Sequence, residues 1–93
     1  MSTENFINVK KHTLKKHEKD TDFAVLHIKS LIDNAKDSIF TRFINHPAWD
    51  LELYKKLVND KLISKYNINS RVEGDKIVII NNEFKHIFKY ERS

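Results

Sequence analysis

The sequence contains no cysteine, one glycine and one proline among its 93 residues. Without cysteine, the chain forms no disulfide, no thiolate metal site and no cysteine nucleophile. One glycine is too few for a glycine-rich phosphate-binding loop, and the motifs of zinc proteases and of serine hydrolases are also missing. These absences argue against the common enzyme classes. We expect a protein that is not an enzyme and that binds no cofactor and no metal.

Long hydrophobic runs are missing as well. No stretch of about 18 apolar residues occurs, so the sequence predicts no membrane span. The segment from Met1 to Asn8 lacks the basic start and apolar middle of a signal peptide. A chain without cysteine also suits a reducing compartment. We therefore expect a cytoplasmic protein with no membrane partner.

The composition is that of a folded chain, with 40% hydrophobic, 11% aromatic and 32% charged residues. This is enough apolar material for a core, and the length is typical of one small domain. We expect a single domain over residues 1–93. Within it, residues 1–20 would form a basic N-terminal arm or a weak helix, and residues 21–93 an α+β body.

Positive charge is concentrated near the N-terminus. Residues 10–19, KKHTLKKHEK, carry five lysines and one glutamate, and this formal charge of +4 equals the net charge of the whole chain. The concentration predicts an acidic partner, most simply the phosphate backbone of DNA or RNA. The alternative is a charged segment that only improves solubility. The candidate phosphate contacts are Lys10, Lys11, His12, Lys15, Lys16, His17 and Lys19.

Apolar residues at helical spacing follow this segment. They recur at steps of three or four residues from Ala24 to Phe43, after a group of capping residues at 20–22. The spacing predicts one helix over residues 22–45, or two helices that meet near Asp37. Pro47 then predicts the start of another helix over residues 48–66.

The apolar period changes to two after residue 67. Gly74 and Asp75 separate two short apolar runs, which predicts a two-residue hairpin turn. Residues 83–91 fit either a strand or a helix, and we favour a third strand because an isolated hairpin is marginally stable. The expected fold is α+β, with two or three helices in the first two-thirds. A small antiparallel hairpin or three-stranded meander follows at the C-terminus.

The order of these elements resembles the winged-helix arrangement over residues 22–80. In that comparison residues 37–45 are the second helix, residues 48–66 the recognition helix and residues 68–80 the wing. Two features disagree with it: the apolar stripe continues through Asp37, and the wing tip carries Glu73 and Asp75 where DNA would favour basic residues. The resemblance lies in element order alone and identifies no family.

Aromatic residues offer a second hypothesis. Either they belong to the core, or they contact a partner as stacking platforms or apolar anchors. In the second case the chain would be a protein-interaction module, such as a phage-type accessory protein, an inhibitor or an adaptor of a larger host protein. The sequence thus predicts a small non-catalytic binding protein, with nucleic acid as the first candidate partner and a host protein as the second. The candidate aromatic contacts are Trp49, Phe84, Phe88 and Tyr90.

Overall fold

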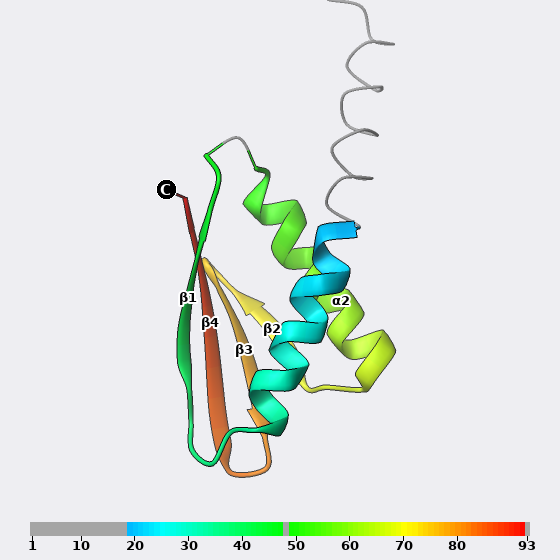
Figure 1. Ribbon diagram of the computed structural model, residues 1–93, viewed down its shortest axis with the longest axis vertical. Helices are drawn as coiled ribbons and strands as arrows, with labels where there is room; N and C mark the ends of the chain where they lie inside the picture. Colours follow the sequence, from blue (N-terminus) through cyan, green and yellow to red (C-terminus); the bar gives the residue numbers. More distant parts are fainter. Residues whose placement is uncertain (1–18, 48, 93) are drawn as a thin grey trace, which may run out of the picture.

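The computed structural model describes residues 19–47 and 49–92, in which two helices lie on one face of a four-stranded mixed sheet (Figure 1). The predicted α+β class is confirmed. The sheet has the order β1-β4-β3-β2, in which β1 is parallel to β4 and the other pairs are antiparallel. The elements are a helix over residues 19–33, here called the first helix, β1 (Phe40–Asn45), α2 (Leu51–Tyr66), β2 (Ser70–Glu73), β3 (Lys76–Asn81) and β4 (Phe84–Arg92).

Strand β1 corrects the prediction of helix for residues 40–45. Phe43 fits both patterns, because it continues the helical stripe from Ile39 and also alternates with its strand neighbours. The strand wins for two reasons: FTRFIN consists largely of β-branched and aromatic residues, and β4 supplies a partner. The first helix ends at residue 33, so the single long helix and the winged-helix element order are both wrong.

The polar residues at 20–22 lie inside the first helix and do not cap it. Thr21 is buried, and its hydroxyl oxygen accepts a hydrogen bond of 2.8 Å from Lys61 on α2. Asp22 accepts bonds from Lys61 and Lys65, and these bonds lower the pKa of its carboxyl group. These side chains therefore join the two helices.

Helix α2 begins later than Pro47 suggested, because Asp50 is the N-cap. Its carboxylate accepts a bond of 3.1 Å from the backbone N–H of Leu53. Pro47 instead lies in a turn, which the N–H of Trp49 closes on the carbonyl of His46. At the other end Asn67 adopts the left-handed conformation and caps the helix near the predicted position.

The C-terminal meander agrees with the prediction. β2 and β3 form a hairpin around Gly74 and Asp75, and Gly74 has the positive φ that the turn requires. The buried amine of Lys55 on α2 donates hydrogen bonds to the Gly74 carbonyl and to Glu52, which holds the hairpin tip against the helix. The second turn is at residues 82–83.

The core lies between the helices and the sheet face that they cover. Its residues come from every layer and are almost completely buried, so the helices and the sheet stabilise one another. Phe88 at the centre of the sheet stacks on the ring of Phe43 at a centroid distance of 6.0 Å. The buried core cluster consists of Val25, Ile28, Ile32, Tyr54, Val58, Leu62, Ile77, Ile79, Phe88 and Tyr90.

Candidate nucleic-acid interface

The opposite face of the sheet is not covered by any element of the described residues (Figure 1). Because side chains alternate along a strand, the strand register assigns each residue to one of the two faces. We call the set that points away from the helices the uncovered face. It consists of the apolar residues Phe40, Ile44, Val78, Ile80 and Ile87, the basic residues Arg42, Arg71, Lys76, Lys85 and Lys89, and the acidic residues Glu73 and Glu91.

Charge on the uncovered face is predominantly positive, with five basic and two acidic side chains. Glu91 accepts hydrogen bonds from Arg42 at 2.6 Å and pairs with Lys89 at 3.0 Å. These bonds, that of Arg42 first, lower the pKa of the Glu91 carboxyl group, and the bond to Glu91 raises the pKa of Lys89. Glu91 therefore stays ionised and holds two neighbouring cations in place.

Two lysines of this face have no ion-pair partner of their own, since Glu73, which lies opposite Lys76 on β2, is paired with Arg71. In the described part of the chain, no acidic group lies at ion-pair distance from Lys76 on β3 or from Lys85 on β4. Lys85 is exposed and Lys76 is half-buried among its neighbours. Both amines are thus available to an anion that lies across the strands.

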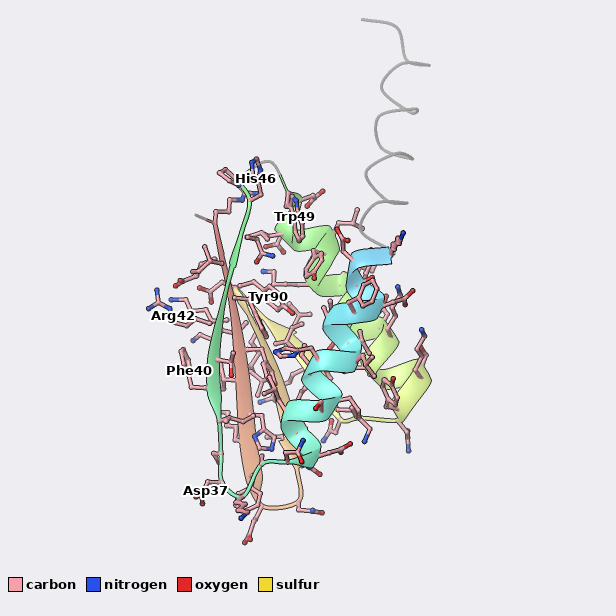
Figure 2. All side chains as sticks on the ribbon, viewed as in Figure 1. Asp37, Phe40, Arg42, His46, Trp49 and Tyr90 are labelled. Carbon is pink, nitrogen blue, oxygen red and sulfur yellow. The ribbon has the colours of Figure 1, made fainter. Side chains whose placement is uncertain are left out.

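Strand β1 adds an aromatic side chain to these cations. Phe40 is 58% exposed, and Figure 2 shows it beside Arg42 on the side of β1 that faces away from the helices. An exposed ring with basic neighbours can stack on a nucleobase while the cations contact phosphates. The arrangement has the parts of a single-strand binding surface.

The basic segment that the sequence singled out lies mostly outside the described residues. Of its seven candidate contacts, only Lys19 is described, and its side chain is exposed at the start of the first helix. The other six are Lys10, Lys11, His12, Lys15, Lys16 and His17.

The four candidate aromatic residues all point into or toward the helix layer. Phe88 and Tyr90 lie in the core, and burial raises the pKa of the Tyr90 hydroxyl, so neither residue offers a surface to a partner. Trp49 is half-buried against Tyr54 at a ring distance of 5.2 Å, and Phe84 is half-buried as the first residue of β4. The uncovered face is therefore a different surface from the predicted aromatic one.

The β1 residues of this face could not be recognised while residues 40–45 were predicted to be helical. The signal was present in the alternation of Phe40, Arg42 and Ile44 with the inward-facing Phe43. It becomes visible once β1 is taken as a strand.

His86 is completely buried on β4, and its contacts hold the fold together and do not form a binding site. Its Nδ1 accepts a hydrogen bond of 3.3 Å from the backbone N–H of Ile39, and burial lowers its pKa. Its Nε2 has no hydrogen-bond partner among the described residues. A neutral imidazole that fixes the start of β1 fits these contacts.

The remaining surface offers a polar groove of about 310 Å³ near the ends of both helices. The charged side chains in it, Lys29 and Asp33, bond to each other, and Tyr66 lies against the Lys29 amine at 5.7 Å. Across residues 19–47 and 49–92, no cluster of three metal-ligating side chains occurs, and no helix is long and apolar enough to cross a membrane. The uncovered face remains the strongest candidate site.

Comparison with known proteins provides no relative: no family, no curated protein and no solved structure matches the chain.

Proposed function

We propose that this protein is a non-catalytic nucleic-acid-binding protein that holds a single strand across the uncovered face of its sheet. The observation that carries the proposal is the combination of five basic side chains with the exposed Phe40 on a face that no element of the described chain covers. Phosphate contacts from lysine and arginine give affinity for any sequence, and base stacking on an aromatic ring adds to it.

The distribution of charge supports this choice. The described residues carry 13 basic and 11 acidic side chains, a formal charge of +2, while the uncovered face alone carries +3. The rest of the described part is therefore slightly acidic. The two helices carry six basic and five acidic side chains, so a polyanion is attracted more strongly to the uncovered face than to the helix layer. Residues 10–19, with their own charge of +4, would add further phosphate contacts.

The exposed ring of Phe40 favours single-stranded over duplex nucleic acid. A single-stranded nucleic acid can lie across several β-strands and place one base on Phe40 and its phosphates near Lys85 and Lys76. A duplex keeps its bases stacked inside, so the aromatic ring would gain no base contact.

The test is the affinity for a labelled 20-nucleotide oligothymidine and for a labelled duplex, measured by fluorescence anisotropy at two salt concentrations. Lys76→Gln combined with Lys85→Gln should weaken single-strand binding about tenfold and lower the salt slope by about 0.7 for each lost contact. The matched control combines Lys36→Gln with Lys56→Gln, two exposed lysines outside the sheet that, like Lys76 and Lys85, have no ion-pair partner among the described residues. It removes the same charge and should change affinity much less.

Equal losses from both pairs would mean that only net charge attracts the strand, and would refute the role of the uncovered face. Neutralising the five lysines at positions 10, 11, 15, 16 and 19 measures the contribution of the N-terminal segment separately. Phe40→Ala should reduce affinity by about 1–3 kcal/mol for one stacked base and leave duplex binding unchanged.

A second function, docking on a host protein, has one observation in its favour. Phe23 and Leu26 are 67% and 58% exposed on the outer side of the first helix, where they form an apolar pair. If a host protein binds there, Phe23→Asp with Leu26→Asp should abolish a stoichiometric complex that survives nuclease treatment, with oligonucleotide affinity unchanged. Recovery that depends on intact nucleic acid favours the first function.

A further inference from the structure

Strand β1 lies at the edge of the sheet, and within residues 19–47 and 49–92 no other strand pairs with the second side of its backbone. The Ile39 carbonyl accepts a hydrogen bond of 2.9 Å from the N–H of Ile87, which fixes the direction of the backbone groups along β1. Because these directions alternate, the N–H and C=O groups of Phe40, Arg42 and Ile44 point away from β4. The same three residues carry their side chains on the uncovered face.

An edge strand with free backbone groups is a template for pairing unless it is blunted. β1 has no proline and one charged residue, and its register with β4 runs over all six residues without a bulge. Its two apolar side chains on the uncovered face, Phe40 and Ile44, are each 58% exposed. The other edge strand, β2, has four residues and places the charged Arg71 and Glu73 on the uncovered face. Of the two edge strands that the structure describes, β1 is therefore the open one.

We propose that β1 pairs with β1 of a second copy of this chain, antiparallel and about a two-fold axis at Arg42, to form one eight-stranded sheet. In this register Phe40 of each copy lies opposite Ile44 of the other, and the three outward-pointing residues exchange backbone hydrogen bonds. Shifting the register by two residues in either direction places Arg42 opposite Phe40 or Ile44. Of these three registers, the centred one joins the exposed apolar residues and pairs all three outward-pointing residues, and aromatic pairs with β-branched residues stabilise a sheet.

The two-fold axis brings the Arg42 residues of both copies together. The ion pair of each Arg42 with Glu91 reduces the repulsion between the two guanidinium groups. Each guanidinium is bonded to its own Glu91 on β4 at 2.6 Å, on the side away from the shared edge. The two arginines therefore meet as neutralised pairs. Replacing Glu91 by a neutral residue should therefore increase the repulsion between the two Arg42 side chains and weaken the dimer. Replacing Arg42 as well should remove this repulsion.

Pairing between two copies of β1 stops at a dimer, because the open edge of each copy is then occupied and no third copy can add to it. The resulting dimer carries one continuous uncovered face with twice the basic side chains. A six-residue edge buries less than the roughly 1,200 Å² of a standard interface, so the dimer is weak, with a dissociation constant on the order of micromolar or higher. This inference stands on the geometry of β1 and does not depend on nucleic-acid binding.

Sedimentation velocity of the full chain from 10 µM to 1 mM tests the dimer. A reversible monomer–dimer equilibrium is expected, and Ile44→Lys should weaken it at least tenfold. The control Ile80→Lys places the same charge on the same face, but on the interior strand β3, and should leave it unchanged. Glu91→Gln should weaken the dimer severalfold, and adding Arg42→Gln should restore it. A chain that stays monomeric at 1 mM, or a dimer insensitive to Ile44→Lys, overturns the proposal.

Cysteine cross-linking tests the register without background, because the chain has no cysteine of its own. Arg42→Cys should form a disulfide-linked dimer on mild oxidation, since paired residues in this position have Cα atoms about 5.5 Å apart. Ile44→Cys should not, because the two copies of residue 44 would lie roughly 14 Å apart along the paired strands. Cross-linking of Ile44→Cys in place of Arg42→Cys would contradict the proposed axis.

Discussion

Replacing Gly74 by valine tests how the hairpin turn contributes to the free energy of unfolding. Gly74 has φ +60, and a Cβ atom built on it would meet no atom within 4 Å. The substitution therefore creates no clash, and its whole effect is the cost of holding a β-branched residue in the left-handed region, about 2 kcal/mol. The turn cannot move away to relieve this cost without losing the hydrogen bond from the buried Lys55 to the Gly74 carbonyl.

A loss of about 2 kcal/mol in a domain of this size lowers the melting temperature by roughly 8–16 °C, which thermal unfolding followed by circular dichroism will resolve. Gly74→Asn is the matched control, since the chain already holds Asn67 and Asn82 at φ 55 and φ 58. Asparagine should lose roughly half as much stability as valine or less. Equal melting temperatures for the valine variant and the parent would refute the positive φ and the hairpin register built on it.

Core packing and proton linkage give two further predictions. Leu62→Ala should lower the free energy of unfolding by about 2–5 kcal/mol because Leu62 is fully buried, whereas Ile63→Ala, at its exposed neighbour on α2, should change it little in the same denaturant titration. Burial lowers the pKa of His86, so at mildly acidic pH the unfolded state binds a proton on this side chain more readily than the folded state does. Stability contributed by neutral His86 should be complete above about pH 6.5 and decline as the pH falls below it. His86→Gln, which keeps an acceptor for the Ile39 N–H, should remove this part of the pH dependence, and an unchanged pH profile would contradict it.

Local signals in the sequence were sufficient for the hairpin turn and for the end of α2. The single glycine marked the hairpin, because turn chemistry is a property of neighbouring residues. The end of α2 at Asn67 was found for the same reason. The alternation through Phe88 and Tyr90 fitted a helix as well, and β4 was favoured only because a hairpin without a third strand is marginally stable.

Strand β1 could not be found in this way, because its state depends on a partner that lies more than 40 residues further along the chain. The spacing of Ile39 and Phe43 fits a helix as well as a strand, and only pairing with β4 separates the two. The candidate site could not be predicted for the same reason. Phe40, Arg42 and Lys85 come together only through the strand order, whereas the charged segment at residues 10–19 is visible in the sequence alone.

The central claim is that the uncovered sheet face holds the nucleic acid, and chemical-shift mapping tests it most directly. A uniformly ¹⁵N-labelled chain would be titrated with a short oligothymidine at low and moderate salt, below the concentration at which it dimerises. The largest backbone amide shifts should fall on β1, β3 and β4 around Phe40, Lys76 and Lys85, with the outer sides of both helices unaffected. Shifts confined to the helices, or no shifts at low salt, would contradict it.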